Sequence, residues 1–308
     1  MADVEGRPVQ VALCPWLDEE MPVVDRIQHV LVNAVAQSLR PVVDRKASVH
    51  IGLLVNLPSS RPGLPEDLES SISASVQRLS PHAFSSVVLA RRGHAGALMA
   101  LRSGVAAVAA RKVEACIVVG ADSYLDLETL DWLEETEQLH GAGARNNAWG
   151  FVPGEAAGAV LLVRQDVARK LDLKPFGRIA AVGIDVEQNL IRTGSVCLGV
   201  GLTQAFRAAF AALEPGAQIT DIYCDMNGEP YRADEYGFAV TRTREHFRSP
   251  SEFIAPADCW GDVGAASAPL SLLLAMVASS KQYARGDVAL VWASSDSGER
   301  GAALVAAG

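Results

Sequence analysis

The sequence has no long apolar run, no N-terminal targeting signal and no excess of basic charge. Its longest clean apolar stretch, Pro269–Ala278, is about half as long as a membrane span. At the N-terminus no basic segment precedes an apolar core, so no secretory signal is expected. With 27 Lys and Arg against 36 Asp and Glu, the net charge is −9, which argues against binding nucleic acid or anionic lipid. We therefore expect a cytoplasmic protein with neither a membrane nor a nucleic-acid partner.

Cysteine and metal-binding patterns are also scarce. The five cysteines show no CxxC spacing, so free thiols in a reducing compartment are expected rather than a disulfide framework or zinc site. The six histidines show no metal-ligand spacing, and there is no P-loop or GxGxxG following a strand. The sequence therefore predicts neither a metal nor a cofactor.

What the sequence does contain is an alternation of strands and helices. Val9–Leu13, His50–Leu57 and Ala115–Ala121 are apolar segments of strand length. Asp25 is expected to cap a helix, because apolar residues after it recur at helical spacing. Further elements are expected as helices over 66–79 and 93–110, and strands over 86–90 and 220–226. The pattern predicts an α/β fold with a mostly parallel sheet.

An internal repeat refines this prediction. A helix rich in Gly and Ala begins at Gly93, and the strand ACIVVGAD and the segment GEAAGAVLLV follow it; a second such helix begins at Gly261, followed by DVALVWAS and GERGAALVAA. Small residues let two helices pack closely between two sheets, which predicts a five-layer αβαβα sandwich with halves at 1–165 and 166–308. Residues 123–150 would form a capping insertion in the first half. The alternative is two unrelated helices in an ordinary doubly wound sheet.

Two motifs in the first half carry a resemblance to a known family. The run CIVVGADSYLD, followed by NNAWGFVPGEAAGAVLLV, resembles the β-ketoacyl synthases of the thiolase superfamily. The second motif of that family, GF-x-PGE-x-AG, is matched without a gap by Gly150, Phe151, Pro153, Gly154, Glu155, Ala157 and Gly158. The resemblance implies the αβαβα fold, a homodimer or a heterodimer with an active ketosynthase across the strand 86–90, and an acyl carrier protein as a partner. From the resemblance we also expect the chain to lack the strand-loop-strand that usually precedes the equivalent of Val9.

The resemblance also locates three catalytic groups, none of which is retained. The family's nucleophilic cysteine, at the start of the first buried helix, falls on His94. Its His-Gly-Thr segment falls on Asn227 to Glu229, and before the second helix the histidine of one subfamily falls on Gly261 and the asparagine of another on Asp262. A histidine cannot hold an acyl chain as a thioester. Because the helix dipole disfavours a cation at a helix N-terminus, we expect His94 to be neutral.

Three functions remain open. The chain could be a ketosynthase-like protein without condensing activity, which binds an acyl group or carrier or serves as a dimer partner. It could instead be an acyltransferase or hydrolase in which His94 is the general base and Asp262 or Glu229 orients it. It could also retain β-ketoacyl synthase activity, with a cysteine from another chain. An imidazole nitrogen within about 3.2 Å of a carboxylate, in an open pocket, would favour the second.

Four further residues are candidates for the same cleft. Cys259 precedes the second small-residue helix and is either a relocated nucleophile or a small buried thiol beside Trp260. Gly150, Phe151 and Arg92 join Glu229 as candidate ligand-binding residues. Arg92 would guide a phosphopantetheine phosphate or an acidic carrier protein; its alternative role is a solvated or interface position.

Overall fold

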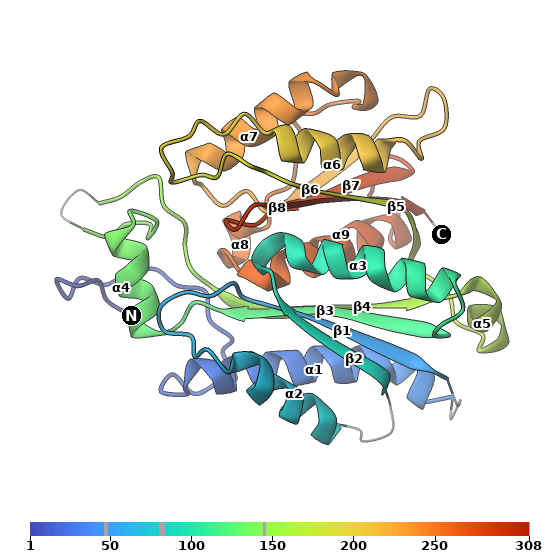
Figure 1. Ribbon diagram of the computed structural model, residues 1–308, viewed down its shortest axis with the longest axis horizontal. Helices are drawn as coiled ribbons and strands as arrows, with labels where there is room; N and C mark the ends of the chain where they lie inside the picture. The colour runs from blue at the N-terminus through green and yellow to red at the C-terminus, as the bar shows by residue number, and fades with distance from the viewer. Residues whose placement is uncertain (46–48, 80–83, 144–145, 308) are drawn as a thin grey trace.

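Helices and sheets alternate in five layers along one direction of the molecule, which a computed structural model describes over residues 1–45, 49–79, 84–143 and 146–307. In Figure 1, α1 (Val23–Val43) and α2 (Leu68–Leu79) cover the outer face of the first sheet. The middle layer is α3 (Gly93–Ala109) and α9 (Ser267–Ser280), and α6 (Val200–Phe210) and α7 (Pro230–Thr241) cover the second sheet. Three buried apolar clusters lie between these layers. The order of layers is the one expected from the two small-residue helices.

Each sheet has four strands. The first has the order β2-β1-β3-β4 and is formed by β1 (Ile51–Leu57), β2 (Phe84–Arg91), β3 (Ala115–Ser123) and β4 (Glu155–Val163). The second has the order β5-β8-β7-β6 and is formed by β5 (Gly177–Val186), β6 (Asp221–Cys224), β7 (Val288–Ser294) and β8 (Glu299–Ala307). β1 is parallel to β2 and β3, and β6 to β7, whereas β4, β5 and β8 pair antiparallel. Both sheets are therefore mixed, and the expectation of a mostly parallel sheet is wrong, because half of these strand pairings are antiparallel.

The same succession of helix, strand and antiparallel strand ends both halves, as α3-β3-β4 and α9-β7-β8. Because β4 ends at Val163 and β5 begins at Gly177, each half contributes one sheet. The domain boundary between 165 and 166 stays a prediction. The insertion 123–150 holds α4 (Leu127–Glu135), and its residues 144 and 145 lie outside the described ranges.

Small residues permit the close approach of the middle layer to both sheets. A Cβ on Gly158 of β4 would lie 2.9 Å from the backbone nitrogen of Leu270 on α9, and a Cβ on Gly301 of β8 would lie 2.7 Å from Leu98 of α3. Ala95, Ala97 and other apolar residues of α3 and α9 are buried in one cluster with both sheets. Cys116 belongs to this cluster, as a core residue of β3. The short α5 (Gln165–Lys170) links the halves, and α8 (Ala257–Trp260) with two 3₁₀ turns, Arg244–His246 and Gly264–Ala266, completes the elements of the described residues.

Two local predictions are wrong. Val9–Leu13 is not a sheet strand: within it only Ala12 forms a bridge, parallel to Gly154. Pro8 and Pro15 flank this segment and restrict continued pairing. The first helix begins at Val23 after Pro22, and Asp25 lies in its first turn instead of capping it. There its charge suits the positive end of the helix dipole.

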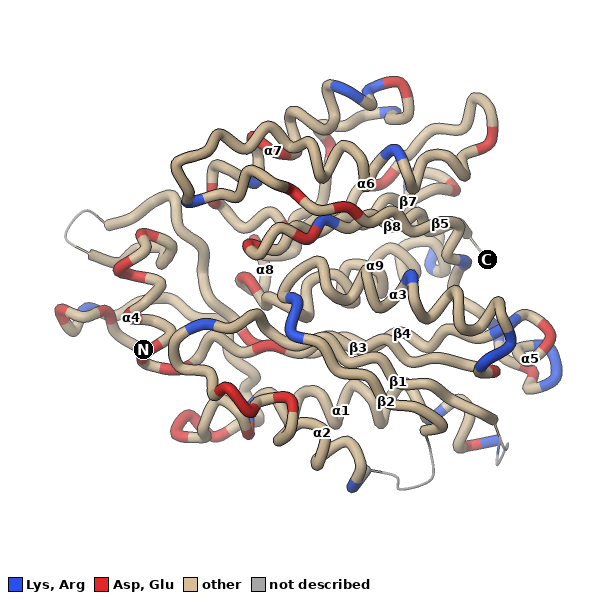
Figure 2. The backbone as a smooth tube through the Cα atoms, in the orientation of Figure 1, with Lys and Arg blue, Asp and Glu red and all other residues tan. Residues whose placement is uncertain are grey.

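No helix in the described part of the chain combines the length and apolar character needed to cross a membrane. Acidic and basic residues are interspersed along the backbone (Figure 2).

Candidate functional site

Three residues that the resemblance assigns to catalytic positions meet between the two halves of the chain. His94 is the second residue of α3, and its Nε2 lies 2.8 Å and 3.0 Å from the two carboxylate oxygens of Asp262. Asn227, in the turn after β6, donates from Nδ2 to Asp262 Oδ2 at 2.6 Å. All three side chains are buried. The structure thus brings together His94, Asn227 and Asp262, the three residues that the resemblance located.

Backbone geometry fixes the position of His94. The chain leaves β2 and enters α3 through Gly93, which has a φ of +59°, a value that a residue with a side chain adopts only with strain. A Cβ there would also lie 2.9 Å from the Ser59 hydroxyl oxygen. Asn56 of β1 donates to the Gly93 carbonyl at 2.7 Å, and the Ser295 hydroxyl accepts from the Ala95 amide at 2.9 Å.

Asp262 is held by both its backbone and its side chain. Its amide donates to the carbonyl of Val152 at 2.7 Å, and its carbonyl accepts from the amide of Gly154 at 2.8 Å. The side-chain Oδ1 accepts from the amide of Gly264 at 2.7 Å. The GF-x-PGE segment of the first half thereby sets the position of an acidic residue of the second half.

The electrostatics of His94 differ from the prediction. Burial alone would lower the pKa of His94, but the charge of Asp262, the hydrogen bond to it and the more distant Asp225 outweigh that effect, so the pKa of His94 is raised. Burial would raise the pKa of Asp262, but His94 and Arg232 lower it well below its usual range. The pKa of His94 is therefore shifted in the direction opposite to that expected from the helix dipole, because the paired carboxylate acts more strongly. The expectation of a neutral His94 stays a prediction.

The raised pKa of His94 beside Asp262 predicts how the thermal stability of the chain depends on pH. A raised folded pKa means that the His94 contribution is complete below the unfolded pKa of about 6.5 and is lost as pH rises through the folded pKa. We expect the melting temperature of the unaltered chain to fall as pH rises from about 6 to about 9. In His94→Asn the fall over the same pH range should be smaller, because the pair is absent. Thermal unfolding followed by circular dichroism checks this, with His246→Asn as the control. Equal slopes in all three proteins would contradict the assignment.

Glu229 connects this pair to a wider polar network. Its carboxylate accepts from Asn227 at 3.0 Å, Arg192 at 3.1 Å, Gln138 at 3.2 Å and the Tyr231 hydroxyl at 3.2 Å. Sequence reasoning included Glu229 but missed Arg192 and Gln138. Both stand in connecting segments, on opposite sides of the network, and no local spacing pattern marks them.

Arg232 lies behind Glu229 and is fully buried. It donates to Asp225 at 2.8 Å and to the carbonyl of Ser294 at 2.9 Å, and its Nε lies 3.4 Å from Glu229. Asp296 accepts from the Tyr231 hydroxyl at 3.0 Å. Charged groups of both signs thus neutralise each other inside the site.

A small cavity borders this network. The cavity that Asp262 lines together with Asp225 and Trp260 has a volume of about 10 Å³, which is room for about one water molecule. The 2.8 Å separation between His94 and Asp262 meets the distance condition for an acid–base enzyme, but this cavity is too small for an acyl chain.

Two other candidates of the sequence, Phe151 and Gly150, lie in packed parts of the first half. Phe151 is buried in a small apolar cluster, its ring centroid 5.4 Å from that of Tyr124. Gly150 packs under Gln138, whose carbonyl oxygen would lie 2.4 Å from a Cβ on Gly150. Both residues make packing contacts within the chain, and their ligand-binding role stays a prediction.

Arg92 and Cys259 are both exposed. The Arg92 side chain is 55% accessible and lies 2.8 Å from Glu299 at the start of β8. Cys259 lies on α8 and is exposed, so its expected burial beside Trp260 is wrong. Cys259 lies on the separate four-residue α8, which has no buried residue. The buried small-residue helix begins only later, at Ser267.

Comparison with solved structures identifies the fold. The ketosynthase from module 6 of the bacillaene synthase of Bacillus subtilis 168 superposes with a TM-score of 0.72 at 14% sequence identity, over 92% of this chain. The chain has a ketosynthase fold. An oxazolomycin ketosynthase domain of Streptomyces albus JA3453, OzmH KS7, gives a TM-score of 0.68 at 15% identity over 92% of this chain. The chain spans about three fifths of these ketosynthases, 59% and 61% of their lengths.

A third structure matches over more of its own length. It is described as a type II polyketide synthase acyl-carrier protein in complex with its ketosynthase bound to the hexaketide (AntDE:AntF), and the TM-score is 0.73 at 13% identity. The match covers 97% of this chain and 88% of that chain. Neither a protein-family model nor a curated protein matches this sequence. At these identities the shared property is the ketosynthase fold.

Proposed function

We propose that this chain is a non-condensing member of a ketosynthase assembly, which serves as the dimer partner of an active ketosynthase. The observation that carries the proposal is the buried His94–Asp262 pair, 2.8 Å apart. The resemblance implies that His94 stands where a condensing enzyme has its thiolate. A buried, ion-paired imidazole cannot form the acyl thioester on which condensation depends.

The cysteines support the same conclusion. Burial raises the pKa of Cys14 and of Cys116 to about 11, and burial raises the pKa of Cys224 as well. These thiols stay protonated at neutral pH and are poor nucleophiles. Cys197 lies in the loop before α6, and Cys259 is exposed on α8. No cysteine occupies the start of α3.

An open sheet edge supports the role of dimer partner. β2 is an edge strand of the first sheet, and among the described residues no strand pairs with its outer side. Ser85, Ser86 and Val88 on it are exposed, with Val88 54% accessible. An exposed strand edge offers unpaired backbone groups to another chain. The heterodimer expected across the strand 86–90 would use this edge, and an acyl carrier protein would reach the assembly through its active subunit.

A specific observation favours a second function. The His94–Asp262 hydrogen bond is the arrangement of a general base with its orienting carboxylate. Since Nε2 faces Asp262, Nδ1 would be the nitrogen that moves a proton. The second candidate is therefore an acyltransferase or hydrolase that opens its site on binding a carrier-bound acyl group.

One assay separates these functions. We expect the purified chain to give no condensation product from acyl- and malonyl-carrier substrates, and no acyl-protein adduct by mass spectrometry. Loss of the acyl group from the carrier that disappears in both His94→Gln and Asp262→Asn, with circular dichroism unchanged, would establish the hydrolase instead. Condensation that survives His94→Ala but not Cys259→Ala would overturn the proposal.

A second experiment tests the partner role. A cysteine-bearing ketosynthase, identified by mass spectrometry, is expected to co-purify with this chain from its native source. Val88→Asp would bury a charge at the shared edge and should weaken the association by about tenfold or more. Tyr283→Asp, at a residue that is 61% exposed elsewhere on the surface, is the matched control. A strict homodimer, or equal weakening by both variants, would contradict the partner role.

A further inference from the structure

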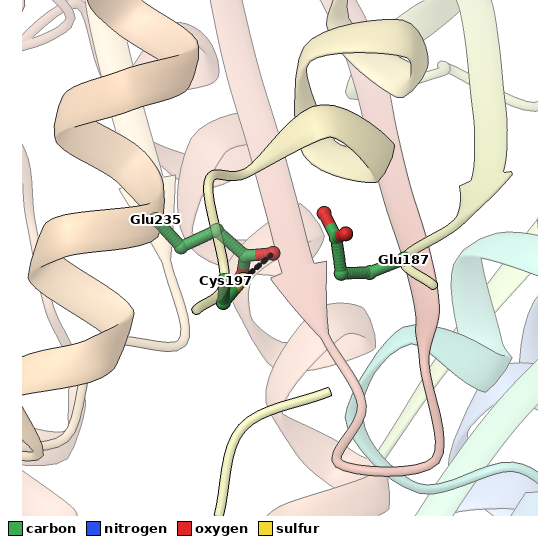
Figure 3. Close-up of side chains that lie close together, drawn as sticks. All are labelled: Glu187, Cys197 and Glu235. Carbon is green, nitrogen blue, oxygen red and sulfur yellow. Dashed lines mark hydrogen bonds between the residues drawn. The ribbon is translucent and has the colours of Figure 1, made fainter. Parts of the chain in front are cut away.

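Three side chains that bind metals in other proteins meet on the far side of β8 from α3. Glu187 follows β5, Cys197 lies in the loop before α6, and Glu235 projects from α7 (Figure 3). One ligand atom of each lies within 4.8 Å of the others. Glu187 is 2% exposed and Glu235 is fully buried, whereas Cys197 is partly exposed. The sequence showed no such site because the three residues come from separate segments.

Glu235 has an unsatisfied oxygen in this cluster. Its Oε1 accepts from Arg300 Nε at 2.5 Å and lies 3.8 Å from Cys197 Sγ. Its Oε2 is buried and has no hydrogen-bond partner. A buried carboxylate oxygen without a partner is costly and uncommon in native proteins. In a cluster of ligand-type side chains it points to a bound cation.

The balance of charge leads to the same inference. Two carboxylates share the site with one buried cation, Arg300, so one negative charge is uncompensated. Glu187 accepts from the amides of Gly201 at 2.9 Å and Asn189 at 3.2 Å, which leaves lone pairs on its carboxylate free. A thiolate would bring the excess to two negative charges. A divalent cation matches that excess.

We propose that Glu187, Cys197 and Glu235 bind one divalent transition-metal ion, with Zn²⁺ the preferred one. A thiolate with two carboxylate oxygens suits a tetrahedral Zn²⁺, and water would supply the fourth ligand. Zn–O and Zn–S bonds place ligand atoms roughly 3.5 Å apart, so the three side chains need to close by about 1 Å. On binding, the Cys197 S–H bond breaks, sulfur keeps the electron pair for zinc, and the proton passes to solvent.

Such an ion would also constrain the loop between Glu187 and Cys197, and through this loop the polar network around Glu229. Glu187 and Cys197 stand at the two ends of the segment that carries Arg192, which donates to Glu229 at 3.1 Å. Holding both ends fixes the position of Arg192. The inference does not depend on the proposed function, because it requires neither a partner nor a reaction.

The test uses the full chain after removal of bound metal. Its cysteines are kept reduced with a reductant that contains no metal-binding thiol. Titration with Zn²⁺ is expected to show one site per chain. Titration with Co²⁺ should show the near-ultraviolet charge-transfer band of a thiolate ligand. Cys197→Ala should abolish the band and weaken Zn²⁺ binding by at least roughly 10–100-fold. That is the loss caused by removing a residue that only supports a metal ligand, and Cys197 would be a ligand itself. Cys259→Ala, which removes the exposed cysteine on α8, should change neither.

Glu187→Gln is the second variant, because a glutamine oxygen can still accept from the Gly201 amide while it binds zinc more weakly. Glu235→Gln is less suitable, since it would unpair the buried Arg300. Weaker binding in Glu187→Gln with unchanged circular dichroism supports the site. The proposal fails if no stoichiometric binding occurs, or if the cobalt band persists in Cys197→Ala.

Discussion

Replacing Glu155 with alanine is expected to lower the free energy of unfolding by about 3–5 kcal/mol, the cost of breaking a buried ion pair from one side. The Glu155 carboxylate accepts from Arg26 Nε at 2.8 Å and Nη2 at 2.9 Å, and both side chains are buried. It also accepts from the Cys14 amide at 2.8 Å and the Ser123 hydroxyl at 3.0 Å. One side chain thus joins α1, the N-terminal segment and the end of β3, and its loss leaves Arg26 charged and buried. The shift of the urea midpoint, multiplied by the unfolding slope, measures the effect.

A double variant distinguishes the cost of leaving Arg26 unpaired from the cost of losing the packing of Glu155. Arg26→Met combined with Glu155→Leu removes both charges, so it should be more stable than Glu155→Ala. Recovery should be incomplete, because the Cys14 amide and the Ser123 hydroxyl lose their acceptor. A loss below about 1 kcal/mol in Glu155→Ala would show that the ion pair contributes no more than an exposed one.

The motif that revealed the fold proves to be structural. Glu155, on β4, contacts α1, the N-terminal segment and the end of β3. A Cβ on Gly154 would lie 2.9 Å from the carbonyl oxygen of Trp260. Gly158 packs against Leu270 of α9 in the same way. Packing between the two halves needs Gly154 and Gly158, and Glu155 holds the first half together, whether or not a thiolate is present. The fold could therefore be predicted from residues that the chemistry does not use.

The candidate site could be predicted only in part. The resemblance locates Asn227 and Asp262 with His94, because the family's motifs mark where the strand before Asn227 ends and where the second small-residue helix approaches. The direction of the His94 pKa shift could not be predicted, since the helix position is visible in the sequence but the 2.8 Å contact with Asp262 is not. Arg192 and the group of Glu187, Cys197 and Glu235 were missed for the same reason: contacts between distant segments leave no spacing pattern.

Gly120→Ala is expected to lower the free energy of unfolding by about 3 kcal/mol, at the upper end of the cost of overpacking. Gly120 ends the apolar part of β3, and a Cβ there would lie 2.0 Å from the carbonyl oxygen of Ala265. That backbone cannot move freely: the Ala265 amide donates to Asp122 at 2.9 Å, and its carbonyl accepts from Asn56 at 3.2 Å. A forced shift would also move Gly264, whose amide donates to Asp262. Destabilisation should therefore be accompanied by a weaker pH dependence from the His94 pair.

Gly237→Ala is the matched control for this substitution. Gly237 is an exposed residue inside α7, and a Cβ there meets no atom within 4 Å. Because glycine weakens a helix interior, this substitution should raise stability by up to about 1 kcal/mol. Urea unfolding of both variants at two pH values, about 6 and about 9, measures stability and its pH dependence together. If Gly120→Ala is as stable as the unaltered chain, or is destabilised with an unchanged pH dependence, then β3 and the His94 pair are not coupled through Ala265.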